Sequence, residues 1–253
     1  MFLAASSCLP RGILQRRGVR GVLWATLTLR GCSGAVQKLP PLPRLDLPAA
    51  LLASHGFSET ANWLVPGLVL VGANPHKGPE NLAFRLASIR GDAGCGTFVS
   101  LQREAEEQAK FGDYHPAARL VRAIDKVEPT FLRLPIEDFQ PAESLSWIEG
   151  HVQMLADRVA DGEIVYMHCA AGRGRTGLMA ACLLGALYEG LNAEEALKRV
   201  GAYYRLRDHF KTAESPKPPL NDTSPETETQ FQQVRDFYSL YRTTPEPAKL
   251  KGG

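Results

Sequence analysis

A cysteine and an arginine that lie six residues apart, Cys169 and Arg175, form the strongest chemical signal in the sequence. They belong to the run HCAAGRGRTG at positions 168–177, which separates two apolar stretches. The glycines of this run allow the backbone to curl, so that successive N–H groups point inward and bind an anion. A helix that follows directly adds the positive end of its dipole at the same point. The run therefore predicts a phosphate-binding loop formed by Ala170, Ala171, Gly172, Arg173, Gly174 and Arg175.

A cysteine at the base of such a loop is suited to act as a nucleophile. The N–H groups, the helix end and the guanidinium all stabilise a negatively charged sulfur, and the thiolate is the reactive form of cysteine. Arg175 can donate two parallel hydrogen bonds to phosphate oxygens, in the bound ester and in the transition state. We therefore expect attack of the Cys169 thiolate on phosphorus. The alternative is a structural turn around a buried and inert thiol.

The oxygen that leaves phosphorus needs a proton, and a carboxylic acid on a loop can supply it. The segment LPIEDFQP, at positions 134–141, carries two acids at the end of an expected strand. Asp138 is our choice for the proton donor, and Glu137 is the alternative. Both acids could instead be solvated loop residues that cap the helix expected near Glu143.

Three other residues carry weaker signals. Arg173 adds a second cation to the loop, which would favour a substrate with several negative groups or would simply strengthen the field for any phosphate. Cys95 precedes a strand that could neighbour the strand ending at Met167, so a reversible disulfide between Cys95 and Cys169 is a further hypothesis. Core packing is the alternative for Cys95 and Cys182. The histidines are scattered, and we expect no metal and no cofactor.

Apolar patterns place these residues in alternating strands and helices. Short apolar runs predict strands over Leu68–Val71, Thr97–Leu101, Thr130–Ile136 and Ile164–Met167. Longer periodic stretches predict helices over Pro79–Arg90, Glu143–Asp161, Thr176–Leu187, Asn192–Ala202 and Ser224–Tyr241. Asn192 and Ser224 are the expected caps, with Pro225 at the first position of the last helix. The alternation predicts an α/β fold, with a central mixed, mainly parallel sheet flanked by helices on both faces.

The basic residues are unevenly distributed along the chain. Seven of the 29 basic residues and none of the 27 acidic residues lie in positions 1–45, so the remainder is mildly acidic. An arginine-rich start without acids is typical of organellar targeting segments, and a basic disordered arm is the alternative. The mildly acidic body argues against nucleic-acid binding. No apolar stretch is long enough to span a bilayer.

The chain divides into four parts on these grounds. We expect a targeting segment over residues 1–38, a proline-rich extended linker over 39–54, a catalytic domain over 55–243 and a disordered tail over 244–253. The targeting segment predicts a soluble protein of the mitochondrion or plastid, with the cytoplasm as the alternative. We expect a monomer.

The run at positions 168–177 resembles the signature loop of the protein tyrosine phosphatase superfamily, in its dual-specificity branch, over about residues 61–241. The resemblance implies a phosphotyrosine phosphatase-like fold, with Cys169 as nucleophile, Arg175 as phosphate ligand and Asp138 as acid. By the same resemblance Thr176 would assist departure of the sulfur, and His168 would orient the loop and favour the thiolate. Gln230, in the segment SPETETQ, would help to place the hydrolytic water or would simply lie on an exposed helix face.

The function predicted from these residues is hydrolysis of phosphate monoesters in two steps through a phosphocysteine. The substrate would be a phosphoprotein, a phosphoinositide-like lipid or a phosphorylated sugar. A phosphate-recognition or scaffold protein on the same fold is the alternative, although binding alone needs neither Cys169 nor Asp138. A sulfurtransferase of rhodanese type also uses a loop cysteine, but it would not require Arg175 followed by Thr176.

Overall fold

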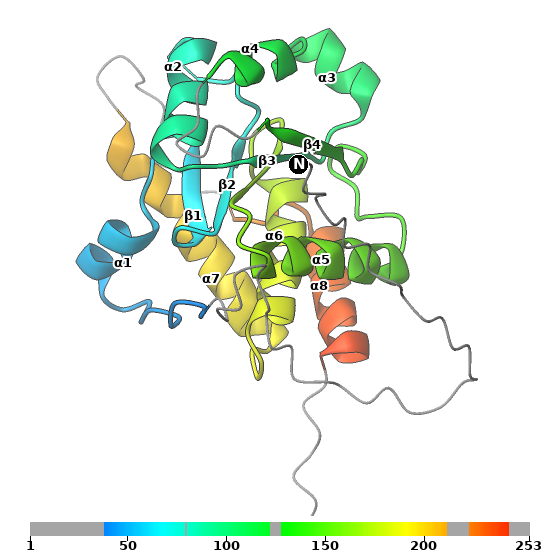
Figure 1. Ribbon diagram of the computed structural model, residues 1–253. Helices are drawn as coiled ribbons and strands as arrows, with labels where there is room; N and C mark the ends of the chain where they lie inside the picture. Colours follow the sequence, from blue (N-terminus) through cyan, green and yellow to red (C-terminus); the bar gives the residue numbers. More distant parts are fainter. Residues whose placement is uncertain (1–37, 79, 122–127, 212–222, 243–253) are drawn as a thin grey trace, which may run out of the picture.

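Five strands form one sheet in the order β1-β2-β5-β3-β4. A computed structural model describes residues 38–78, 80–121, 128–211 and 223–242 of the chain (Figure 1). The edge strand β1 is antiparallel to β2, and every other neighbouring pair is parallel. This confirms the predicted mixed, mainly parallel sheet. The strands are β1 (Ala61–Val65), β2 (Val69–Ala73), β3 (Thr97–Ser100), β4 (Thr130–Arg133) and β5 (Val165–Cys169).

Helices cover both faces of this sheet, as predicted (Figure 1). One face carries α1 (Pro48–His55), α5 (Leu145–Ala160), α6 (Gly174–Leu187), α7 (Ala193–Arg205) and α8 (Glu228–Tyr241). The other face carries α2 (Leu82–Leu86), the π-helical turn η1 (Ala87–Asp92) and α4 (His115–Leu120). The remaining short elements are α3 (Glu104–Lys110) and the 3-10 helix η2 (Leu206–Phe210).

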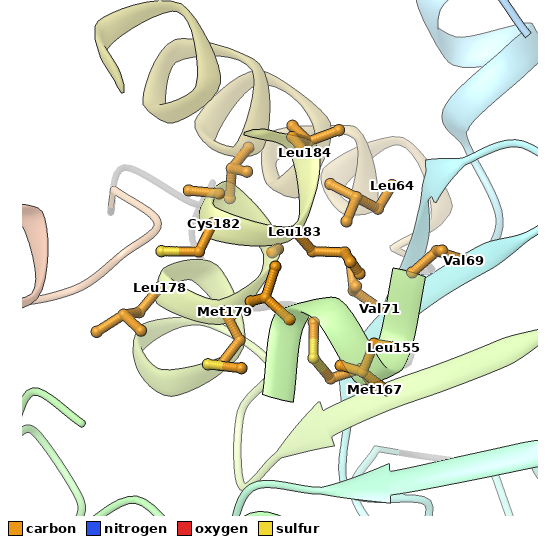
Figure 2. Close-up of a cluster of buried hydrophobic side chains, with 14 of the residues drawn as sticks. Leu64, Val69, Val71, Leu155, Met167, Leu178, Met179, Cys182, Leu183 and Leu184 are labelled. Carbon is orange, nitrogen blue, oxygen red and sulfur yellow. The ribbon is translucent and has the colours of Figure 1, made fainter. Parts of the chain in front are cut away.

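Side chains that alternate along each strand divide the core into two clusters, because successive residues of a strand point to opposite faces. In β5, Tyr166 joins the cluster under α2 and α4, whereas Val165 and Met167 join the cluster under the longer helices. Helix α6 crosses the larger cluster and is buried along almost its whole length. Figure 2 shows its apolar side chains against those of β2, β5 and α5. This burial fixes the helix that follows the predicted phosphate loop.

Two sequence expectations about chain segments are corrected by the structure. The second half of the expected linker, over residues 39–54, contains helix α1, because Pro48 fits the first helical turn and Leu51 is buried in the larger core. The last helix begins at Glu228 with Thr227 as its cap, rather than at Ser224. Ser224 instead donates a hydrogen bond to the carbonyl of Arg173.

Other expected elements keep their places with shifted ends. Ser144 caps α5 and Asn192 caps α7 through side-chain hydrogen bonds. The expected helix over Pro79–Arg90 is shorter in its α-helical part and continues as the π-helical turn. Of the four predicted parts of the chain, the targeting segment up to residue 37 and the tail over 244–253 lie outside the described residues. Within the described ranges, no helix combines the length and the apolar character that crossing a bilayer requires.

Replacing Leu183 with alanine tests the packing of α6. The Leu183 side chain is fully buried in the larger core. We expect Leu183→Ala to lower the free energy of unfolding by about 2–5 kcal/mol, because the cavity that it leaves can collapse only in part. Urea unfolding gives the value. Leu120→Ala is the matched control, since Leu120 is 83% exposed and its truncation should change stability by less than about 0.5 kcal/mol. Equal effects of the two substitutions would contradict the assigned packing.

Candidate active site

Cys169 lies at the carboxyl end of β5, the central strand of the sheet. Strands β2 and β3 flank it in parallel, and Ala73 pairs with Cys169 itself. In parallel sheets, ligands bind at the carboxyl ends of the strands. Cys169 is 3% exposed, whereas Cys95 and Cys182 are at 0%. Of the three cysteines among the described residues, Cys169 is the one at the carboxyl ends of the parallel strands, and helix α6 begins five residues later at Gly174.

The loop between β5 and α6 has the curled shape that the glycines predict. Gly172 has φ of 66°, in the left-handed region. A Cβ at this position would also lie 2.2 Å from the carbonyl carbon and oxygen of Gly72. The backbone N–H of Asn74 donates to the carbonyl of Ala170 at 3.4 Å. The loop thus packs directly on the end of β2, which explains why glycine occupies position 172.

Arg175 is held by two carboxylates. Its Nη1 and Nη2 donate to the two oxygens of Glu106 at 2.7 and 2.9 Å. Nη2 also lies 2.8 Å from Oδ1 of Asp138, and Nη1 donates to the carbonyl of Ile136 at 3.2 Å. The Arg175 side chain is 1% exposed, and its Nε has no hydrogen-bond partner among the described residues. Glu106 and Asp138 therefore fix the guanidinium at the loop and leave one donor unused.

Glu106, from α3, was not singled out by the sequence. Burial raises the pKa of this carboxyl, but hydrogen bonds and charge from Arg175 outweigh burial and hold the pKa below its usual value. For the same reason the pKa of Arg175, which burial alone would lower, is raised by its pairing with Glu106. Glu106 is one acid in the run EAEE at positions 104–107, and no spacing rule distinguishes it from its neighbours.

The two candidate acids occupy different surroundings. Asp138 lies between Arg175 and Lys110, with its Oδ2 3.5 Å from the Lys110 ammonium. Glu137 pairs with Arg103 at 2.9 Å, and both of these side chains are 57% exposed. Asp138 is therefore the acid that the structure brings to the loop, and Glu137 is turned to the surface.

His168 is fully buried beside the nucleophile, and its Nε2 lies 2.7 Å from the hydroxyl of Tyr114. Burial lowers the pKa of His168 to about 3, so the imidazole is neutral. A neutral His168 does not favour a thiolate by positive charge, and its role in orienting the loop stays a prediction. Glu107, 2% exposed, accepts hydrogen bonds from Asn74, Ser100 and Arg133, and Ser100 pairs with His168 in the sheet. Neither Tyr114 nor Glu107 carried a signal in the sequence.

Thr176 lies in the first turn of α6 and is 1% exposed. Its Oγ1 has no hydrogen-bond partner among the described residues. Buried hydroxyls are nearly always paired, so an unpaired one beside the loop is a notable exception. Its position is compatible with the predicted role of assisting the sulfur, which stays a prediction.

Arg173 and Gln230 are both engaged in contacts with the chain itself. Arg173 donates to Glu226 at 2.8 Å and to the carbonyl of Thr223 at 2.9 Å. Gln230 is fully buried, in contrast to the exposed position considered from sequence. Its side-chain oxygen accepts the N–H groups of Glu226 and Thr227, and its amide donates to the carbonyl of Gln140. The side chain of Gln230 therefore joins the start of α8 to the segment that carries Asp138.

The disulfide hypothesis for Cys95 is wrong. Cys95 precedes β3 at the amino end of the parallel strands, where Thr97 pairs with Val165, four residues before Cys169. At about 3.3 Å per residue the two cysteines are more than roughly 13 Å apart along the strand. Disulfide Cα atoms are at most about 7 Å apart. Cys95 is a core residue, and burial raises its pKa.

Among the described residues, no group of three or more His, Cys, Asp or Glu could hold a metal ion.

The structure thus places a thiol and a glycine-shaped loop at the carboxyl end of the central strand β5, as the resemblance to dual-specificity phosphatases implies. The family model PTP-SAK, described as "Swiss Army Knife protein, DSP-PTPase phosphatase domain", matches residues 58–230. The chain belongs to this family, which confirms the resemblance seen in the sequence.

Individual proteins are similar to this chain over part of its length. A protein of Invertebrate iridescent virus 3, provisionally named tyrosine phosphatase 067L, is 30% identical over 153 residues. That match covers 59% of this chain and 56% of the viral protein, so the chain spans about half the length of this relative. Among solved structures, Tk-PTP in its active form has a TM-score of 0.50 at 19% identity, over 72% of this chain and 97% of that one. PTPMT1 has a TM-score of 0.49 at 21% identity, over 71% of this chain and 94% of that one. The match to Tk-PTP, at less than 25% identity, reflects a shared fold.

The pairing of Glu106 with Arg175 can be tested through pH. Because the pKa of Glu106 is lowered in the folded state, its contribution to stability is complete above the unfolded value, about 4.3. The contribution is lost as pH falls through the folded pKa. We expect Glu106→Gln to remove this part of the acid sensitivity, measured by urea unfolding between pH 3 and pH 6. Glu104→Gln, an exposed acid of the same helix, is the control and should keep the wild-type slope. An unchanged slope in Glu106→Gln would contradict the pairing.

Proposed function

We propose that this chain hydrolyses phosphate monoesters through a covalent phosphocysteine on Cys169. The observation that carries the proposal is the meeting of three groups at one loop: the Cys169 thiol at its base, the Arg175 guanidinium, and the Asp138 carboxyl 2.8 Å from that guanidinium. A module that only bound phosphate would need the loop and the arginine, but not the thiol or the acid.

Substrate binding would rearrange the contacts of Arg175. A phosphate oxygen can accept from Nε, which has no partner among the described residues, and a second can replace Asp138 at Nη2. Such a pair of parallel hydrogen bonds is the preferred geometry between arginine and phosphate. Glu106 keeps its hold on the other side of the guanidinium. Arrival of phosphate would thus release Asp138 from its ion pair.

The reaction then follows in two steps. In the first, the Cys169 thiolate attacks phosphorus in line, and protonated Asp138 gives its proton to the leaving oxygen. In the second, Asp138 takes a proton from water, the water oxygen attacks phosphorus, and the sulfur leaves as a thiolate. Thr176 would hydrogen-bond to that departing sulfur. Inward N–H groups of the loop would stabilise the equatorial phosphate oxygens in both steps.

We propose that the substrate is a phosphoprotein or a polyanionic phosphate such as an inositol lipid or a sugar phosphate. The contact of Arg173 with Glu226 gives its charge a partner within the chain, so a preference for several phosphates does not follow from this residue. Phosphate release from phosphopeptides, inositol lipids and phosphoglucans, compared at equal concentration, would separate the classes.

We also propose that residues 1–38 direct the chain to the mitochondrion or plastid. The proposal is supported by composition alone, since basic residues and no acids occur up to Leu45. Fusion of residues 1–38 to a fluorescent protein would test it, and a diffuse cytoplasmic signal would contradict it.

Replacing Cys169 with serine tests the nucleophile. Serine lacks a readily ionised group, so we expect Cys169→Ser to reduce turnover of 4-nitrophenyl phosphate to background, by at least about 10³-fold. Binding of inorganic phosphate and the urea midpoint should be retained, since the exchange removes little volume. Turnover at the wild-type rate would exclude Cys169 as the nucleophile.

Replacing Asp138 with asparagine tests the acid. Asparagine keeps the size of the side chain but cannot give up a proton, so we expect kcat to fall by about 10²–10⁴. The loss should be larger for an alkyl phosphate than for 4-nitrophenyl phosphate, because a poor leaving group depends more on protonation. Glu137→Gln is the matched control and should have nearly wild-type kcat. A larger loss in Glu137→Gln would reverse the assignment of the acid.

A further inference from the structure

Arg207 lies buried behind the phosphate loop, and the predicted chemistry does not use it. It belongs to η2 and is 2% exposed. Its Nε donates to the side-chain oxygen of Asn62 at 2.8 Å, and its Nη2 donates to the carbonyl of Val71 at 3.2 Å. Its Nη1 donates to the carbonyl of Ala171, within the loop, at 3.4 Å. One side chain thus joins β1, β2 and the loop.

The hydrogen bond to Ala171 orients the next N–H group of the loop. In a trans peptide, the carbonyl and the following N–H point in opposite directions. Because Arg207 holds the Ala171 carbonyl at the back of the loop, the N–H of Gly172 points away from Arg207. In a loop whose N–H groups converge on an anion, that direction would be toward the bound anion.

Within the described part of the chain, no carboxylate balances the charge of Arg207. Its three acceptors are neutral, and the Tyr204 ring lies 4.8 Å from its guanidinium carbon. No acidic side chain of the described residues forms an ion pair with it. Burial of a cation without a counter-ion is costly, and burial lowers the pKa of Arg207 despite opposing effects of Tyr204, Tyr166 and Cys169. An anion held in the loop would supply the missing charge.

We propose that Arg207 is a positioning residue that fixes the curl of the loop and has the Cys169 thiolate as its counter-ion. This inference rests on the proposed function, in which the thiolate is the nucleophile. A permanent cation at the back of the loop favours the thiolate before substrate arrives, while Arg175 binds phosphate at the front. The two arginines therefore divide the tasks of preparing the nucleophile and of binding the ester.

Several ionisable groups near the Cys169 sulfur could affect how its reactivity depends on pH. Arg175 comes from α6 and Arg207 from η2, and both interact electrostatically with Cys169. From β5, His168 is neutral because burial lowers its pKa, and burial raises the pKa of Tyr166. Both rings are therefore uncharged between pH 5 and pH 9. The cations of this set are the two arginines, and the carboxylates of Glu106, from α3, and Asp138 pair with Arg175 rather than with Arg207.

The test measures the thiolate directly, without turnover. Iodoacetamide alkylation of Cys169 would be followed by mass spectrometry from pH 4 to pH 10 in the full chain, with the buried Cys95 and Cys182 as internal references. The variants are Arg207→Met, which removes the charge at similar length, and Arg207→Lys, which retains it. Arg205→Met is the matched control, since Arg205 is exposed two residues away. Circular dichroism checks folding, and Arg207→Gln replaces Arg207→Met if the latter does not fold.

We expect the midpoint of Cys169 alkylation to rise by about one pH unit or more in Arg207→Met. The rise should be smaller in Arg207→Lys and absent in Arg205→Met. A purely structural role predicts equal midpoints for the lysine and methionine variants, so that result, or a wild-type midpoint in folded Arg207→Met, would overturn the proposal. The assay also separates the two hypotheses. If the alkylation midpoint rises in Arg207→Met relative to wild type, but the wild-type protein releases no phosphate from any ester tested, the proposed function fails while the role of Arg207 stands.

Discussion

The site depends on carbonyl groups of the loop being bound from behind. Asn74, at the end of β2, holds the carbonyl of Ala170, and Arg207 holds the carbonyl of Ala171. Each trans peptide then turns its own N–H to the opposite side. In the proposed reaction these oriented N–H groups bind the phosphate together with the guanidinium of Arg175. Gly172 completes the arrangement, because only glycine allows the loop to approach β2 so closely.

The charged side chains at the site are paired with one another in the absence of substrate. Arg175 is paired with Glu106 and Asp138, which keeps a nearly buried guanidinium in one orientation. Its partners differ in exposure, since the Glu106 side chain is 15% exposed and that of Asp138 37%. The more solvated carboxylate is the easier one to displace. Phosphate would therefore compete with Asp138 rather than with Glu106, which leaves the arginine anchored while the acid becomes free to react.

The parts of the site that the sequence predicted are those encoded locally. The run at positions 168–177 contains the thiol, the glycines and Arg175 within one strand, loop and helix, so their geometry follows from neighbouring residues. Glu106, Tyr114 and Arg207 are missed because they reach the loop from 69, 54 and 36 residues away. The residues that flank an arginine or a glutamate in the sequence do not indicate which distant group its side chain will contact. The strands β2, β3, β4 and β5 were predictable because apolar patterns are local. Their order in the sheet, and the end of the sheet at which Cys95 lies, depend on pairing between distant segments and were not predicted.

The start of α8 links the phosphate loop to the acid. Gln230 bonds at once to the N–H groups before α8 and to the carbonyl of Gln140, two residues after Asp138. Thr227 reaches the carbonyl of Phe139, whose φ of 61° is costly for a residue with a Cβ. Such a backbone conformation persists only where surrounding contacts enforce it. The same segment also bonds to Arg173 through Glu226. The residues before α8, together with Gln230, therefore connect the segment that carries Asp138 to the phosphate loop, which gives Gln230 a structural role that requires no contact with water.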